Sequence, residues 1–283
     1  MSFRLAAITD EFASDLEIAV RAMAESGMTG AELRMIDGKN IMDLTDAELD
    51  RAISITRAHS LEIVSIASPL LKCVLPDAPA IDPRYQQDAF AAFHTFEEQT
   101  RLAARAFEVA RRTGAHIIRV FSYWRTVRPE AVFDRVVAAL RSLAGQASQH
   151  GVTIALENEH ACNIAGGAEA ARVLAVLDHP NLKLVWDPGN ALMSGETPFP
   201  DGYRMLAPSR IAHVHAKDCR WQDGKLVWWT LGEGLIDWKG QIAALERDGY
   251  QGWISLETHW RGPSEDPLDA SMICARNLKA LAG

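Results

Sequence analysis

Residues 211–219 read IAHVHAKDC, and they show the pattern on which the rest of the chain is built. Apolar residues alternate loosely with His213 and His215, and this period of two predicts a short β-strand. Because side chains two residues apart point to the same face of a strand, the two imidazoles share one face. Lys217 and Asp218 follow at or just past the end of the strand. The predicted strand therefore ends in polar groups.

Three other short apolar runs end in an acidic residue in the same way. They are VTIALE, ending at Glu157, LKLVWD, ending at Asp187, and WISLE, ending at Glu257. Oxygen and imidazole ligands of this kind suit a divalent metal such as Mn²⁺, Co²⁺, Zn²⁺ or Mg²⁺. A single acid at a strand end is often a helix N-cap or a solvated loop residue, and a histidine is often a core group. The metal hypothesis therefore depends on whether the four strand ends meet in space.

Short strands alternate with helical segments along the whole chain. The predicted strands cover residues 5–9, 31–35, 61–67, 115–121, 152–156, 182–186, 211–219 and 253–256. Such alternation predicts a parallel sheet, and eight units in 283 residues fit an α/β fold, a (βα)₈ TIM barrel forming a single domain over residues 1–283. The rival is a doubly wound open sheet, but no G-x-G-x-x-G or Walker sequence follows a strand. A barrel would bring all the strand ends to one face.

Capping patterns mark the helices between these strands. Ser14, with Glu17 three residues later, predicts one helix start, and Thr45 with Glu48 predicts another. Gly151 is the expected stop of a helix that begins near residue 129.

Two connections depart from this regular pattern. Residues 68–84 hold four prolines, and long loops in compact domains are often functional. Ser68-Pro69 is expected to stop the third strand, and a helix is predicted over 85–112. The pair Asp223-Gly224 predicts the turn of a small hairpin after the seventh strand.

Composition narrows the class of function. The formal net charge is −8, and an acidic chain is a poor nucleic-acid binder because affinity for phosphate backbones comes mostly from Lys and Arg. The four cysteines are far apart in sequence, which favours free thiols in a reducing compartment. No apolar run approaches membrane-spanning length, and the first residues hold no long apolar core of a signal peptide. A cytoplasmic location without membrane partners is expected.

Several segments together resemble one known family. LENEH, WDPGN, HVHAKD and SLETH, with GEGLIDW between the last two, resemble the xylose-isomerase-like sugar isomerase and epimerase barrels. That group includes ketose 3-epimerases, hydroxypyruvate isomerase, inosose dehydratase and, more distantly, endonuclease IV. The resemblance covers nearly the whole chain and is most specific from Glu157 to Glu257. It implies a (βα)₈ barrel that holds one divalent metal ion, Mn²⁺ in first place, with Co²⁺, Zn²⁺ or Mg²⁺ as alternatives.

The resemblance also implies roles for particular residues. Glu157, Asp187, His215 and Glu257 match the metal ligands of the family. In the family's His-x-His segment the second histidine holds the metal, so His215 is the expected ligand and His213 the alternative. Glu157 and Glu257 would also act as the acid/base pair, one on each face of the substrate. In a dry pocket, desolvation and neighbouring charges can bring the pKa of such a carboxylate towards the working range.

Further residues are expected to contact the substrate. They are Asn190, Lys217, His259, Glu32, Lys72 and Trp124. For Lys217 a salt bridge at the top of the barrel is an equal alternative. For Lys72, which could bind a carboxylate or phosphate, an exposed loop lysine is the favoured interpretation, and for Trp124 loop packing is an equal alternative. Glu32 and Arg34 share one face of a strand, so Glu32 would reach substrate only if that face points inward. Glu159 and His160 are alternative proton-transfer residues.

The expected function is that of a metal-dependent isomerase or epimerase. Its substrate would be a small ketose, sugar acid or sugar phosphate, and protons would move through a metal-stabilised cis-enediolate. The alternative is a lyase of the inosose dehydratase kind, which expels a β-hydroxyl after the same first step. Endonuclease IV activity is not expected, because Asn190 stands where that family has a ligand histidine. A small carbohydrate is the expected partner, nucleic acid is not, and a homo-oligomer is compatible with the sequence.

Overall fold

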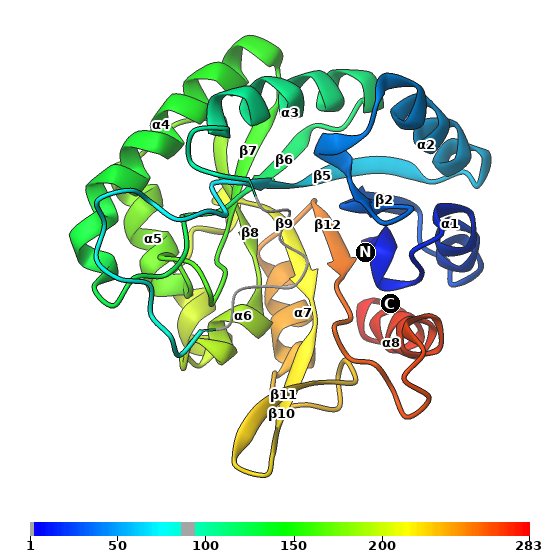
Figure 1. Ribbon diagram of the computed structural model, residues 1–283. Helices are drawn as coiled ribbons and strands as arrows, with labels where there is room; N and C mark the ends of the chain where they lie inside the picture. Colours follow the sequence, from blue (N-terminus) through cyan, green and yellow to red (C-terminus); the bar gives the residue numbers. More distant parts are fainter. Residues whose placement is uncertain (1–2, 86–93) are drawn as a thin grey trace.

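Eight parallel strands close into a barrel in a computed structural model that describes residues 3–85 and 94–283 (Figure 1). Around the barrel the order is β1-β12-β9-β8-β7-β6-β5-β2, and each neighbouring pair is parallel. The strands are β1 (Arg4–Ile8), β2 (Gly30–Leu33), β5 (Glu62–Leu70), β6 (Ile117–Val120), β7 (Thr153–Glu157), β8 (Leu182–Trp186), β9 (Ile211–Ala216) and β12 (Trp253–Leu256). The predicted (βα)₈ barrel is confirmed.

Helices surround the barrel and connect its strands (Figure 1). The α-helices are α1 (Leu16–Glu25), α2 (Asp46–Ala58), α3 (Gln99–Thr113), α4 (Phe133–His150), α5 (Gly167–Val176), α6 (Pro188–Met193), α7 (Trp238–Arg247) and α8 (Pro267–Ala282). Short helical turns are η1 (Thr9–Glu11), η2 (Ile41–Asp43), η3 (Pro129–Val132), η4 (Pro198–Gly202) and η5 (Pro208–Arg210). In the described part of the chain, no helix is long and apolar enough to cross a membrane.

The helix caps follow the sequence signals with one exception. Thr45 and Glu48 form the predicted capping box at the start of α2, and Gly151 ends α4 in a left-handed conformation (φ 66°). At α1 the N-cap is Asp15, whose Oδ1 accepts a hydrogen bond from the backbone N–H of Ile18 at 2.9 Å. The prediction of Ser14 as the cap is therefore wrong by one residue, because Asp15 is the last extended residue before the helix.

Two predicted boundaries near the proline-rich loop also differ. Strand β5 (Glu62–Leu70) continues through Ser68-Pro69, and its pairing with β6 is irregular between Ile66 and Leu70. Proline is tolerated at such an irregularity because no ladder hydrogen bond is required from its nitrogen. The helix predicted over 85–112 begins only at Gln99, and part of that prediction, residues 86–93, lies outside the described residues.

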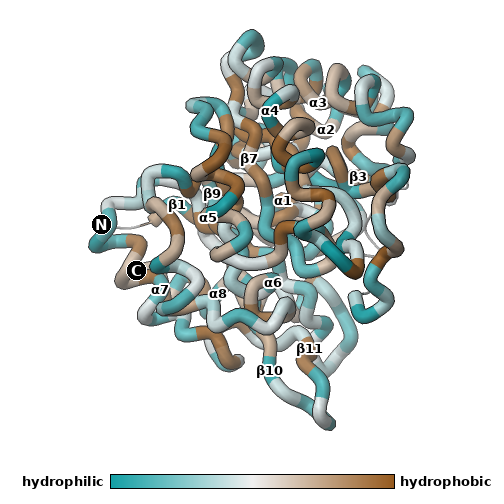
Figure 2. The backbone as a smooth tube through the Cα atoms, turned by 90° about the vertical axis from the view of Figure 1, so that its left-hand side faces the viewer, coloured by the Kyte–Doolittle hydropathy of each residue, from teal (hydrophilic) through white to brown (hydrophobic). Residues whose placement is uncertain are grey.

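Hydrophobic residues fill the space between strands and helices, whereas part of the barrel interior is polar. Figure 2 shows hydrophobic segments around β7 and β9, with hydrophilic segments on the outer turns. Glu32, Ser65, His213, His215 and Ser255 are all fully buried. They belong to strands β2, β5, β9 and β12, and they contact one another across the barrel interior.

Two small antiparallel hairpins extend from the carboxyl ends of barrel strands. The first pairs β3 (Met35–Ile36) with β4 (Lys39–Asn40), and the second pairs β10 (Asp218–Gln222) with β11 (Lys225–Trp229). The predicted turn at Asp223-Gly224 is confirmed, with positive φ at both residues (49° and 76°), as a tight hairpin turn requires. Asp218 fixes the base of the second hairpin, because its carboxylate accepts hydrogen bonds from the backbone N–H groups of Cys219, Gly232, Gly234 and Ile236.

Candidate metal centre

The four predicted metal ligands meet at one end of the barrel. Glu157 is the last residue of β7, Asp187 directly follows β8, His215 lies on β9, and Glu257 directly follows β12. These four strands are consecutive in the barrel, so their carboxyl ends are adjacent. One ligand atom from each of the four residues lies within 4.8 Å of all the others. The requirement that the four strand ends meet in space is therefore satisfied.

His215, not His213, faces the three carboxylates. Its Nδ1 is 3.3 Å from Glu157 Oε1, 3.3 Å from Glu257 Oε2 and 3.7 Å from Asp187 Oδ2. The Nε2 atom of His213 instead lies 3.0 Å from Glu32 Oε2, deeper in the barrel. His215 is two positions further along β9 than His213 and therefore lies further along the barrel axis. Only His215 reaches the level of the strand ends.

The chemistry of these four side chains fits a divalent metal ion. Three carboxylates and one imidazole nitrogen are the ligand types that Mn²⁺, Zn²⁺ and related ions take. Glu157 Oε2 and Asp187 Oδ2 are buried and form no hydrogen bond of acceptable geometry with any described residue, although each lies within ion-pair distance of a cation. Buried carboxylate oxygens normally have hydrogen-bond partners, so oxygens of this kind are suited to accept a metal.

Three basic side chains surround the acidic cluster. Lys217 Nζ lies 2.9 Å from Asp187 Oδ2 and 2.7 Å from Glu257 Oε2. Arg34 Nη1 lies 3.1 Å from Glu257 Oε1, and Arg119 Nη1 lies 3.3 Å from Glu157 Oε2. Burial by itself would raise the pKa of Glu257, but the Lys217 ammonium and nearby histidines hold it well below its usual range. The predicted salt bridge of Lys217 is thus present, and its ammonium lies directly beside two of the candidate ligands.

A chain of hydrogen bonds leads from the ligands to His160. Asn190 donates from Nδ2 to Glu157 Oε1 at 3.0 Å, and its Oδ1 lies 2.9 Å from His160 Nδ1. The same nitrogen lies 2.8 Å from Glu159 Oε1. Burial would lower the pKa of His160, but the Glu159 carboxylate raises it above its usual value. With its pKa raised and its Nδ1 held by two oxygens, the imidazole is suited to donate a proton.

The structure places Lys72 and Trp124 beside this chain. Lys72 is buried, so the interpretation as an exposed loop lysine is wrong. Its Nζ lies 3.6 Å from Glu159 Oε2 and 4.3 Å from the centre of the Phe121 ring. Trp124 is also buried and packs in a small apolar cluster with Phe121. The long loop after β5 folds inward, which the prolines in its sequence did not indicate.

On the opposite side of the centre, His259 follows Glu257. Its Nδ1 lies 3.0 Å from Glu11 Oε1, and its Nε2 lies 3.8 Å from Glu257 Oε1. Trp228, on the β10–β11 hairpin, packs edge-on against both His259 and His160, with ring centres 5.1 and 6.0 Å apart. The hairpin thus carries an aromatic ring between the two histidines.

Three residues of the site lie outside the set that the sequence patterns predict. They are Glu11, Arg119 and Trp228. Arg119 sits at an inward position on β6, and a charged residue inside an apolar strand, as in HIIRVF, was the available signal. Glu11 and Trp228 lie on local segments without such a signal.

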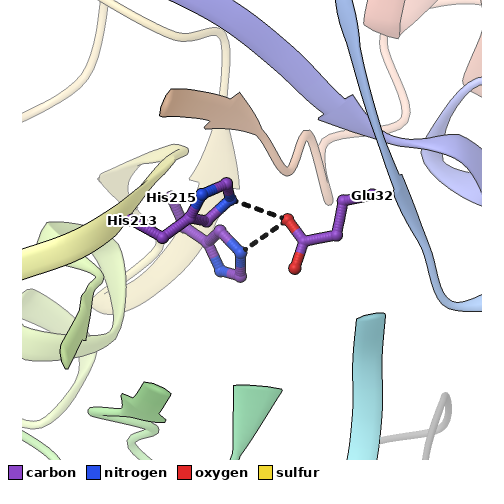
Figure 3. A group of neighbouring side chains, drawn as sticks. All are labelled: Glu32, His213 and His215. Atoms are coloured by element: carbon purple, nitrogen blue, oxygen red, sulfur yellow. Dashed lines mark hydrogen bonds and ion pairs between the residues drawn. The ribbon is translucent and has the colours of Figure 1, made fainter. Parts of the chain in front are cut away.

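Glu32 points inward, as the expectation of substrate contact required, but its surroundings are protein side chains. Figure 3 shows its carboxylate directed at the rings of His213 and His215. Ser65 and Ser255 donate hydrogen bonds to the same carboxylate. The carboxylate is thus enclosed below the four candidate ligands, with no exposed surface.

This fold and this site agree with one family of barrels. The chain belongs to the xylose isomerase-like TIM barrel family, whose model matches residues 20–278. A solved structure described as IOLI protein with a binding zinc atom shares the fold, with a TM-score of 0.74 and 18% identity, and the match covers 99% of this chain and 97% of that one. The family expected from the sequence is confirmed.

Curated relatives of this chain include inosose dehydratases. That of Lacticaseibacillus casei is 26% identical over an alignment of 163 residues, and the match covers 52% of this chain and 54% of that protein. That of Geobacillus thermodenitrificans (strain NG80-2) is 25% identical over an alignment of 176 residues, and the match covers 56% of this chain and 58% of that protein. The matches therefore span little more than half the length of these relatives. They support an enzyme of this family more strongly than they support an isomerase or epimerase in particular.

Proposed function

We propose that this protein is a metal-dependent lyase that removes water from a small polyhydroxy ketone, with an inosose as the first substrate to test. The observation that carries the proposal is the position of the His160 imidazole, which contacts Asn190 and Glu159 beside the ligand cluster without being one of the candidate ligands. A dehydration needs a base for the proton beside the carbonyl and a separate acid for the departing hydroxyl. The similarity to inosose dehydratases supports the same reaction.

Glu157, Asp187, His215 and Glu257 would hold the metal, with Mn²⁺ in first place and Co²⁺, Zn²⁺ or Mg²⁺ as alternatives. When bound, such an ion supplies a Lewis acid that polarises the substrate carbonyl and orients the neighbouring hydroxyl. Lys217, with its raised pKa, stays an ammonium and offers a second positive charge to the oxygen that becomes negative as the proton leaves.

Two carboxylates are positioned to take the substrate proton. Glu257 is paired with Lys217 and Arg34, whereas Glu157 is held by Asn190 and Arg119. In the proposed reaction the C–H bond beside the carbonyl breaks, and one of these carboxylates accepts the proton.

His160 completes the elimination on the next carbon. The β C–O bond breaks as a C=C bond forms, and the leaving oxygen takes a proton from the imidazolium to depart as water. Asn190 and Glu159 fix the orientation of the imidazole, because both contact its Nδ1. Lys72 and Asn190 would bind hydroxyl groups from this side, and His259, with Trp228 packed on it, from the other.

An isomerase or epimerase of a ketose, sugar acid or sugar phosphate is the second candidate. It is favoured by Glu157 and Glu257 standing on either side of His215, each 3.3 Å from its Nδ1. A pair of carboxylates placed in this way suits removal of a proton on one face of a substrate and its return on the other. In this reaction His160 would have no essential role.

The experiment is a substrate screen in D₂O with the metal-loaded protein. Inososes and ketoses are incubated with the enzyme, and mass spectrometry follows loss of water and uptake of deuterium. The dehydratase gives a product that has lost one water, with absorbance of a conjugated carbonyl, and His160→Gln lowers its rate by roughly 10²–10⁴-fold. Deuterium beside the carbonyl without loss of water, with His160→Gln fully active, would establish the epimerase or isomerase instead.

A further inference from the structure

We infer that Glu32 is a positioning residue for the metal. It keeps the ring hydrogen of His215 on Nε2, so that Nδ1 is the nitrogen presented to the ion. His213 and Ser255 hold Glu32 in place for this role. The inference rests on the metal-binding part of the proposed function and not on the reaction. It concerns the three buried side chains of Figure 3, which form a group below the four ligands.

Three hydrogen-bonding groups converge on one oxygen of Glu32. His213 Nε2 lies 3.0 Å, His215 Nε2 3.1 Å and Ser255 Oγ 3.0 Å from Oε2. An ionised carboxylate oxygen accepts hydrogen bonds and donates none, and it can accept all three contacts. With Glu32 ionised, each imidazole therefore carries a hydrogen on Nε2 and donates it to Glu32.

His213 provides independent support for this arrangement. Its Nδ1 is buried and has no hydrogen-bond partner in the described part of the chain. A hydrogen on that nitrogen would be left unpaired, which costs about 1–3 kcal/mol. The hydrogen of neutral His213 is therefore on Nε2, directed at Glu32, and His213 acts as a fixed donor rather than as a ligand.

For His215 the same contact determines which nitrogen is available. With Nε2–H donated to Glu32, the lone pair of the neutral ring is on Nδ1, and Nδ1 faces the three carboxylates at 3.3–3.7 Å. Ligating histidines in proteins commonly donate their other N–H to a carboxylate, and loss of that partner typically weakens metal binding 10–100-fold.

The barrel strands hold the contact between Glu32 and the two histidines in a fixed geometry. Glu32 lies on β2 and the histidines on β9, which are not neighbours, so the contact crosses the barrel interior. Cross-strand pairing places Ser65 beside Glu32 and Ser255 beside His215, and Ser65 donates to the other oxygen, Oε1, at 3.2 Å. The oxygen that contacts the histidines is thus held by Ser255 on a rigid strand, whereas Ser65 contacts only the other oxygen.

The test measures zinc affinity and histidine protonation, without any substrate. Zn²⁺ binding to the full chain is measured by competition with a chromogenic chelator for the wild type, Glu32→Gln, Glu32→Asp and Ser65→Ala. A glutamine amide can turn its NH₂ towards the rings, so it no longer fixes the hydrogen on Nε2. We expect Glu32→Gln to bind zinc roughly 10–100-fold more weakly. Ser65→Ala alters the same carboxylate on the oxygen that does not touch the histidines, and should keep nearly the wild-type affinity.

A second readout is direct. In zinc-loaded protein labelled with ¹⁵N-histidine, two-bond ¹H–¹⁵N correlation spectra should show His215 protonated on Nε2 and metal-bound through Nδ1. If Glu32→Gln fails to fold, Glu32→Asp replaces it, because the shorter side chain keeps the charge but withdraws the oxygen from the rings, and its affinity should also fall. Circular dichroism of the metal-free variants checks that each is folded.

Four results would overturn the inference: unchanged zinc affinity in a folded Glu32 variant, an equal loss in Ser65→Ala, zinc bound through Nε2, or absence of zinc binding by the wild type. Zinc binding that depends on Glu32, in a protein that dehydrates no inosose, would refute the proposed reaction and leave this inference standing.

Discussion

At the scale of single residues, neighbouring groups in the candidate site change the pKa of a side chain. His160 is the clearest case, because burial favours its neutral form while the Glu159 carboxylate, 2.8 Å from Nδ1, favours the cation. The second effect prevails and the pKa of His160 is raised. An imidazole of this kind can still donate a proton at a pH where a free histidine has lost it.

The residue-scale prediction follows from the raised pKa of His160. Only protonated His160 can donate to a leaving hydroxyl, so activity should fall as the pH rises through its pKa. Glu159→Gln removes the negative charge and lowers that pKa, so the alkaline limb of the kcat profile should move to lower pH. The control is Glu169→Gln, which alters a carboxylate paired with Arg125 and not with His160. An alkaline limb that stays in place in Glu159→Gln would exclude His160 as the acid.

At the scale of elements, each helix and strand end places a particular group. Three of the four candidate ligands end a barrel strand or directly follow it, His215 lies one residue before the end of β9, and a residue at a strand end can also cap the helix that follows. Asp187 does both, since its Oδ1 accepts a hydrogen bond from the backbone N–H of Asn190 at the start of α6 while Oδ2 faces the centre. One side chain therefore links the helix start to the candidate metal site.

The element-scale prediction distinguishes the two candidate caps of α1. Asp15→Ala removes the acceptor for the Ile18 N–H and should lower the free energy of unfolding by about 1 kcal/mol. Ser14→Ala, one residue earlier, should change it little, because the Ser14 side chain does not cap the helix. Urea denaturation of both variants, without metal, gives the two values. A larger loss in Ser14→Ala would restore the cap predicted from the sequence.

At the scale of the whole molecule, the candidate metal joins four consecutive strands from the second half of the chain. The unfolded chain has no such site, because its ligands are separated by up to a hundred residues of sequence. An ion that binds only the folded state stabilises it by RT ln(1 + [L]/Kd), about 2.7 kcal/mol at a hundred times Kd.

The prediction at this scale is a Tm that depends on metal. Differential scanning calorimetry should show the Tm rising with Mn²⁺ or Zn²⁺ concentration and falling after dialysis against EDTA. His215→Ala should lose the metal dependence, whereas His213→Ala should still bind one ion, more weakly, because it removes only a donor to Glu32. The same Tm increase in His215→Ala as in the wild type would show that the ion binds elsewhere.

The sequence by itself determined the barrel and the four candidate ligands. Period-two strands alternating with capped helices predict a parallel sheet, and such a barrel gathers its strand ends on one face. Acids directly after three strands and a histidine on a fourth are local features, so Glu157, Asp187, His215 and Glu257 could be placed without a structure. The choice of His215 over His213 came from the family resemblance, not from the strand pattern.

Only the tertiary structure decided what surrounds those ligands. The height of His213 and His215 along the barrel axis depends on how the strands are staggered, which no single strand reveals. The burial of Lys72 depends on how a proline-rich loop folds over the barrel, and the contact of Glu32 with the histidines crosses between strands that are distant in sequence. Such contacts arise from packing between distant segments, so periodicity and capping signals, which act over a few residues, cannot predict them.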